Sequence, residues 1–158
     1  ENLHSLPLSP EAIAQMVTAL AQSGRYQWII IDLPHTITPF SRPLIAACDN
    51  VLAVANVDAN CHIRLQQQTL PASAWLLIND LRIGSQIQDD LYQLWLQSHR
   101  RLLPMAIHRD EALSECLAAK QPLGEYRGDS LAAEEILTLA NWCLLHCAGD
   151  KTPAGIAS

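Results

Sequence analysis

The feature that most constrains the fold is the apolar run of residues 28–31, which is followed directly by Asp32 and, two residues later, by Pro34. An unbroken run of this kind is typical of a strand buried on both faces, as in a parallel sheet covered by helices. Proline cannot extend such a strand, and it favours an extended backbone at Leu33, so Asp32 is expected at or just past the carboxyl end. Ligands of open α/β sheets bind at that edge.

Two interpretations of Asp32 follow from this segment. An acid at the end of a buried apolar strand matches the Walker B arrangement, in which the carboxylate holds the Mg²⁺ of a nucleotide, usually through water. The carboxylate can equally well do no more than cap the next turn, since Asp is a common turn residue. The segment by itself favours neither interpretation.

The rest of the chain alternates between expected strands and expected helices. Strands are predicted at residues 28–32, 51–57, 75–78 and 102–107, the last at an edge or starting at Pro104. Helices are predicted from Pro10 to about Gly24, at about 40–48, around 63–68, after Ser85, at 111–119 and from Ser130 to about Cys147. Strands and helices in this order form right-handed βαβ units, so the fold class is α/β, with a mostly parallel sheet flanked by helices on both faces.

Two helices carry apolar residues at helical spacing. After Ser85, the residues expected to share one buried face are Ile87, Leu91, Leu94 and Trp95. In the closing helix they are Ile136, Leu139, Ala140, Cys143, Leu144 and Cys147.

Polar side chains follow three of the predicted strands: Asp32, Asp58 and Asn79. The carboxyl ends of parallel strands meet at one edge of a sheet, so these residues are expected to gather there as a ligand site. Each of them alone is also explained as an ordinary turn residue.

Composition limits the alternatives. The chain of 158 residues suits one domain with a real core, and a net charge of −6 argues against a nucleic-acid partner. No apolar run approaches the roughly 20 residues that a membrane-spanning helix needs. The five cysteines are odd in number and lie mostly in apolar segments, which favours buried thiols over a disulfide framework.

Residues 26–34 resemble the Walker B strand of the MinD/ParA-type ATPases: usually an aromatic residue or Asp, then four apolar residues, Asp, any residue and Pro. Longer stretches are similar to the branch of that family that serves cellulose biosynthesis in enteric bacteria. These stretches are residues 56–65, 77–86, 94–98, 109–112, 132–136 and 142–145. The resemblance runs from about Ser23 to the C-terminus.

The resemblance implies roles for four residues and one loop. Asp32 matches the Walker B acid, with a water-mediated role in binding Mg²⁺, and Pro34 matches the proline of the switch II region. Asn79 matches the amide that reads adenine, since an amide can pair with the N6 and N7 edge of that base. Arg82 lies against the base or a dimer partner, or is a solvated loop arginine. Residues 108–110 match the loop that closes over the adenine in relatives.

The resemblance also shows what the sequence lacks. A MinD-like ATPase begins with a strand and a glycine-rich loop carrying lysines that hold the phosphates. Here the two lysines are Lys120 and Lys151, and neither lies in such a loop. The chain is therefore expected to be the C-terminal two-thirds of such a protein: residues 1–148 a partial SIMIBI-type P-loop NTPase domain, and residues 149–158 a flexible tail. An exposed apolar strip is expected where the first strand of the family would pair.

The implied function is that of an ATP-binding switch in the machinery of bacterial cellulose biosynthesis and secretion. The complete protein would bind ATP and Mg²⁺, form a nucleotide-dependent homodimer and dock onto other components of the machinery. It would lie in the cytoplasm, with peripheral association at the inner membrane or the cell pole. The alternative is a non-catalytic interaction scaffold of the same secretion system, and an intact phosphate loop upstream would favour the first interpretation.

Overall fold

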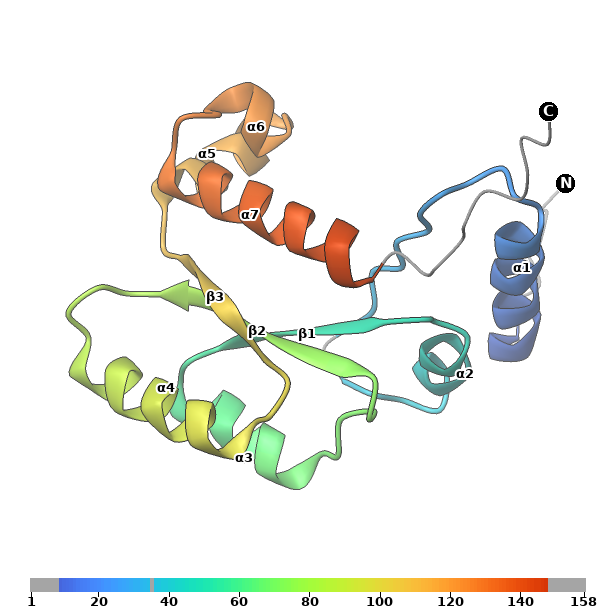
Figure 1. Cartoon of the computed structure of the whole chain (residues 1–158), viewed down its shortest axis with the longest axis horizontal. Coiled ribbons are helices and arrows are strands. Elements are labelled where there is room, and N and C mark those ends of the chain that lie inside the picture. Colours follow the sequence, from blue (N-terminus) through green and yellow to red (C-terminus); the bar gives the residue numbers. More distant parts are fainter. Residues whose placement is uncertain (1–8, 35, 148–158) are drawn as a thin grey trace, which may run out of the picture. The chain divides into compact units, whose positions relative to one another are not determined.

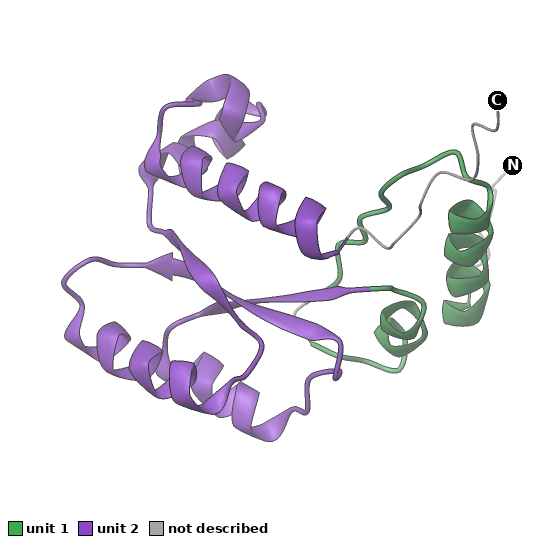
Figure 2. Ribbon diagram, in the orientation of Figure 1, with its two compact units in different colours: residues 1–49 green, residues 50–158 purple. Residues whose placement is uncertain are grey.

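The computed structural model of the chain describes residues 9–34 and 36–147 (Figure 1). The chain divides into two compact units, residues 1–49 and residues 50–158 (Figure 2), and each is described by itself. One continuous domain over residues 1–148 stays a prediction. The expected tail at residues 149–158 lies outside the described residues.

The first unit contains helices α1 (Pro10–Gln22) and α2 (Ser41–Ala46). The hydroxyl of Ser9 caps α1 by accepting a hydrogen bond from the backbone N–H of Ala12 at 3.2 Å. After α1, Gly24 takes a positive φ of 66°, which costs glycine little. Both predicted helices of this unit are therefore confirmed.

The prediction of a strand at residues 28–32 is wrong for this structure. These residues have no regular secondary structure, and the side chain of Ile30 is 90% exposed. A strand is held by hydrogen bonds to a neighbouring strand, and the described part of the first unit contains no strand to supply them. An apolar run predicts that a segment can be a buried strand, but the pairing partner decides whether it becomes one.

The second unit is built on a three-stranded parallel sheet in the order β1–β2–β3, so the α/β fold is confirmed with three strands where four were predicted. The strands are β1 (Val51–Asn56), β2 (Ala74–Leu81) and β3 (Leu102–His108). The helices are α3 (Ala59–Gln67), α4 (Gln86–Ser98), α5 (Glu111–Ala119), α6 (Leu123–Tyr126) and α7 (Leu131–His146). Across residues 9–34 and 36–147, no helix is both long and apolar enough to cross a membrane.

Helices cover both faces of this sheet, as the alternation predicted (Figure 1). On one face, Trp95 of α4 is fully buried and packs in a cluster with Ile78 of β2 and Cys61 of α3. On the other face, Ala132 of α7 packs in a cluster with Leu77 of β2. The central strand β2 is thus enclosed on both sides, which explains its continuous apolar sequence.

The buried faces of α4 and α7 differ in part from those predicted. In α4 the inward residues include Gln88, Leu91 and Trp95, whereas Ile87 is 65% exposed and Leu94 is also exposed. Gln88 takes an inward position because its amide forms hydrogen bonds to the backbone of Asp80 and Arg82.

In α7 the inward residues include Ala132, Leu139 and Trp142, whereas Ile136 and Leu144 are exposed. Apolar residues surround much of this helix, so helical spacing alone did not identify the face that packs on the sheet.

Strand β1 lies at an edge of the sheet and carries exposed apolar side chains. Val54 is 59% exposed, and Leu52 on the same face is exposed as well. The register pairs Val54 with Leu77 and Leu52 with Trp75, so these side chains project from the same face of the sheet. Helix α7 covers this face at β2 but leaves it exposed at β1. An exposed apolar strip is thus present on this edge strand; that the first strand of the family would pair here stays a prediction.

We predict that Trp95→Ala lowers the free energy of unfolding by about 3–5 kcal/mol, since it leaves a large cavity in the core. It also removes the hydrogen bond from the indole Nε1 to Nδ1 of His62, which measures 3.0 Å. Urea unfolding followed by circular dichroism measures the change. Leu94→Ala, at an exposed position of the same helix, is the control and should change stability by no more than about 0.5 kcal/mol. Equal effects of the two substitutions would contradict this account of the core.

Candidate functional site

Two asparagines stand side by side at the carboxyl edge of the sheet. Asn56 ends β1 and is paired in register with Asn79 of β2. The Nδ2 of Asn79 donates a hydrogen bond to the Oδ1 of Asn56 at 3.2 Å. Parallel pairing therefore brings residues 23 positions apart in the sequence into direct contact.

Asp58 lies at the same edge as Asn79, as predicted, but its carboxylate already has a local partner. One oxygen accepts a hydrogen bond from the backbone N–H of Cys61 at 2.8 Å, which caps the start of α3. Capping of α3 is therefore sufficient to explain Asp58.

The backbone of β2 is irregular just after Asn79. Asp80 has a φ of 54°, and the pairing of β2 with β3 is irregular between Ile78 and Leu81. Buried Gln88 holds this segment: its Oε1 accepts from the N–H of Arg82 at 2.7 Å, and its Nε2 donates to the carbonyl of Asp80 at 3.4 Å. The left-handed conformation is unusual for a residue other than glycine, and Asp is among the residues that tolerate it best.

Arg82 is exposed and forms an ion pair with Asp80, with 3.5 Å between Nη2 and Oδ2. The description of Arg82 as a solvated loop arginine fits this environment. Its contact with a base or with a dimer partner stays a prediction.

The loop between β3 and α5 is fixed by backbone and carboxylate contacts. The N–H of Arg109 donates to the carbonyl of Leu81 at 2.9 Å. Glu135 of α7 accepts from the N–H of His108 at 2.7 Å and also contacts the imidazole of that residue. These contacts hold the loop against the end of β2 and against α7.

Asp110 joins the starts of two helices. Its carboxylate accepts from the N–H of Ala132 at 3.0 Å, at the start of α7, and from that of Ala112 at 2.9 Å, at the start of α5. These hydrogen bonds, that of Ala132 first, hold the pKa of Asp110 below its ordinary value. A charged Asp110 therefore stabilises the fold.

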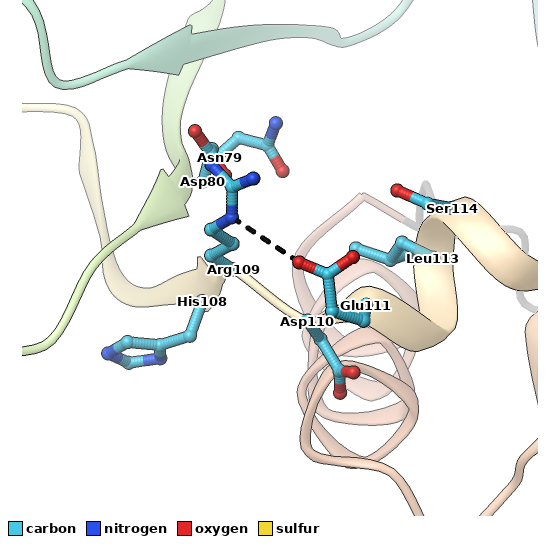
Figure 3. A pocket seen from close by; sticks show the side chains of 8 residues that line it. All are labelled: Asn79, Asp80, His108, Arg109, Asp110, Glu111, Leu113 and Ser114. Carbon is cyan, nitrogen blue, oxygen red and sulfur yellow. Dashed lines mark ion pairs between the residues drawn. The ribbon is translucent and has the colours of Figure 1, made fainter.

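These elements line a small polar cavity of about 170 Å³ that is open to solvent (Figure 3). Asn79 and Asp80 contribute from β2. Residues 108–111 contribute from the end of β3, the β3–α5 loop and the start of α5, and Leu113 and Ser114 complete the lining. In Figure 3 the guanidinium of Arg109 reaches toward the carboxylate of Glu111, at 3.8 Å. The loop that the resemblance assigned to adenine thus lies beside Asn79, and the cavity offers an amide, carboxylates, a guanidinium and a hydroxyl to a ligand.

Asp32 and Pro34 belong to the first unit, where both are exposed in the irregular segment that follows Gly24. Their gathering with Asn79 at one sheet edge stays a prediction, as does the binding of Mg²⁺ by Asp32. Within residues 9–34 and 36–147, no group of three His, Cys, Asp or Glu side chains is arranged to hold a metal ion.

Sequence reasoning assigned no role to three residues that shape this region: Asn56, Gln88 and Glu135. Gln88 and Glu135 are polar residues on inward positions of helices, and a polar residue inside an apolar stripe is the signal that could have found them. Asn56 could have been found by aligning the ends of the second and third predicted strands, residues 51–57 and 75–78.

We predict that Asp110→Ala lowers the free energy of unfolding at neutral pH by about 1–2 kcal/mol, because two helix starts lose their acceptor. The folded pKa is depressed, so the stabilisation is present above the unfolded pKa of about 4 and is lost as the pH falls through the folded value. Urea unfolding of both proteins between pH 7 and pH 2 should therefore show curves that converge at acid pH. Asp90→Ala, at an exposed position of α4, is the control. A difference that stays constant down to the lowest pH would contradict the role of the charged form.

Comparison with known proteins identifies the family. The family profile described as cellulose biosynthesis protein BcsQ matches residues 1–144. The cellulose biosynthesis protein BcsQ of Salmonella typhimurium is 67% identical over 155 residues, which cover 98% of this chain and 62% of that protein. The proteins of the same name from Salmonella typhi and Escherichia coli K12 are 71% identical over 143 residues and 70% identical over 139 residues. These two alignments cover 90% and 88% of this chain and 57% and 56% of the relatives.

The chain thus spans about three-fifths of the length of the curated relatives it matches, at high identity throughout. Both the profile match and these relatives identify the chain as a member of the cellulose biosynthesis protein BcsQ family.

Proposed function

We propose that the whole protein to which these residues belong is an ATP-binding switch in bacterial cellulose biosynthesis. The role in cellulose biosynthesis follows from the names of the relatives. The observation that carries the nucleotide assignment is the polar cavity at the carboxyl edge of the sheet, where Asn79 faces the 108–111 loop. Ligands of open α/β sheets bind at this edge.

The lining of the cavity suits a purine base. The amide of Asn79 has both a donor and an acceptor, which adenine needs along its amino edge. The planar guanidinium of Arg109 is suited to stack on an aromatic ring system. In this proposal residues 79–82 and 108–111 hold the base, and Arg82 lies near the edge of the cavity.

The phosphates and the metal would be held elsewhere. Asp32 is proposed to bind Mg²⁺ through water, and Pro34 to shape the backbone beside it. The phosphate cradle would come from a glycine- and lysine-rich loop, and no Gly-x-x-x-x-Gly-Lys-[Ser/Thr] occurs in the 158 residues. Nucleotide binding would then control a homodimer and its docking to other components of the cellulose machinery.

A second candidate is a non-catalytic scaffold that binds proteins of the same machinery. The observation that favours it is that Asp32, the proposed metal-binding residue, lies in an irregular segment of this structure and does not end a strand. The two candidates differ in whether the whole protein binds ATP with Mg²⁺.

We expect the purified 158-residue chain to show no appreciable ATP turnover. Positioning and electrostatic stabilisation of the phosphates supply nearly all of the catalysis in phosphoryl transfer, and the lysine-bearing loop is not among these residues. Phosphate release with and without Mg²⁺ measures this. Mg²⁺-dependent hydrolysis that Asp32→Ala abolishes would contradict the prediction.

In the whole protein, Asp32 and Asn79 should have separable roles. Asn79→Ala should reduce ATP affinity by roughly ten- to a hundredfold and weaken the preference over GTP, since it removes an amide that pairs with the base. Asp32→Ala should instead weaken the Mg²⁺-bound state and the dimer built on it.

Calorimetry with ATP and GTP, with and without Mg²⁺, separates these effects, and thermal melting reports on folding. Asn141→Ala, at an exposed position of α7, is the matched control for loss of an amide. If Asn79→Ala lowers the melting temperature while the ATP-to-GTP ratio stays fixed, Asn79 is a structural turn residue and the adenine assignment is wrong.

A further inference from the structure

We propose that Gln88 is a positioning residue that sets the distance between the two walls of the cavity to which we assign the base. One wall is formed by Asn79 and Asp80, and the other by residues 108–111. The inference rests on the proposed function, in which this cavity binds adenine. It adds a residue that does not line the cavity and acts through the backbone beside it.

The amide of Gln88 is held in one orientation by backbone groups. Its Oε1 accepts from the N–H of Arg82 at 2.7 Å, and its Nε2 donates to the carbonyl of Asp80 at 3.4 Å. A rotation of the amide by 180° would place its N–H groups against an N–H and its oxygen against a carbonyl, so both hydrogen bonds would be lost. Gln88 is also buried, with 8% of its surface exposed. It is therefore a fixed point that holds the backbone of residues 80–82.

The two hydrogen bonds lie on either side of Leu81, to which the second wall is joined. The carbonyl of Leu81 accepts from the N–H of Arg109 at 2.9 Å. Glu135 joins the same wall to α7, whereas the bond to Leu81 joins it to the first wall. Asp80 has a φ of 54°, an uncommon conformation for a residue other than glycine. Without Gln88, Asp80 would be free to leave this conformation, and the carbonyl of Leu81 would move with it.

A glutamine at this position of a helix usually has another role. Gln88 is the third residue of α4 and Ser85 precedes the helix, which is the sequence of a capping box. In that motif the glutamine amide bonds to the backbone N–H of the capping residue. Here the N–H of Ser85 donates to the carbonyl of Arg82 at 3.2 Å, and the amide of Gln88 bonds to residues 80 and 82 instead. Capping of α4 therefore does not explain Gln88.

A purely structural role for Gln88 makes a different prediction. Its amide would then do no more than satisfy backbone groups at the end of β2. Its loss would lower the melting temperature, and the folded protein would keep its affinity for ATP.

The test measures the dissociation constant of ATP for the whole protein by calorimetry, at a temperature at which thermal melting shows the variants to be folded. Gln88→Met keeps the length of the side chain and removes both hydrogen bonds. It should weaken ATP binding by roughly ten- to thirtyfold, the worth of two hydrogen bonds. Gln97→Met, at an exposed position of the same helix, is the matched control and should stay within about twofold of wild type.

Gln88→Glu tests the pattern of donor and acceptor. A carboxylate can accept from Arg82 but cannot donate to Asp80, so this variant should bind ATP weakly at about pH 8. Burial raises the pKa of a carboxyl, and its protonated form again offers a donor and an acceptor. Affinity relative to wild type should therefore recover toward about pH 5.5. The charged side chains beside position 88 are those of Asp80, Arg82 and Asp89, and comparison with wild type at each pH accounts for their titration and that of ATP.

The outcomes separate this inference from the proposed function. If Gln88→Met melts at a lower temperature but binds ATP as wild type does, Gln88 only stabilises the fold; the inference is overturned, while the adenine assignment of Asn79 stands. If the affinity of Gln88→Glu relative to wild type is the same at both pH values, the pattern of donor and acceptor is not the cause and the inference is overturned as well. Where Gln88→Met does not fold, the Gln88→Glu series decides. If the wild-type protein binds no ATP, the proposed function fails and the inference fails with it.

Discussion

The pairing of β2 with strands on both of its sides brings together the strand ends at which the candidate site lies. Register sets Asn56 beside Asn79, and the end of β3 brings Arg109 to the carbonyl of Leu81. All three strands run in the same direction, so their carboxyl ends share one edge. The edge at which the site lies is thus set by backbone hydrogen bonding between the strands.

Polar side chains in partly buried positions then fix the loops that leave this edge. Gln88 holds the turn after β2, Glu135 holds the end of β3, and Asp110 joins the starts of α5 and α7. Each bonds to backbone groups that regular structure leaves unpaired, and a buried polar group without a partner would cost about 1–3 kcal/mol. The two loops around the cavity are consequently held by helices α4 and α7, which also cover the sheet. Positioning of the site and stability of the core are therefore coupled.

Much of the second unit could be predicted from the sequence because its signals are local. Apolar runs located β1, β2 and β3, and capping residues located the starts of α5 and α7 at Asp110 and Ser130. The inward faces of α4 and α7 were less predictable, since Gln88 and Glu135 occupy positions where periodicity favours apolar residues. Asn56 and Glu135 received no role because their partners lie 23 and 27 residues away in the sequence. Gln88 received none because its partners are backbone groups of a nearby loop, which no side-chain pattern marks.

The segment around Asp32 shows most clearly that a local sequence pattern does not determine tertiary pairing. Residues 28–32 have the composition of a buried strand, yet a strand also needs a neighbour, and composition does not supply one. The cavity beside Asn79, in contrast, is assembled from residues of the second unit alone. In our proposal, recognition of the base depends on these residues, and recognition of metal and phosphate depends on Asp32 and on a loop outside these residues. A protein organised in this way can keep its preference for a base while its catalytic power changes, because the two depend on different hydrogen bonds.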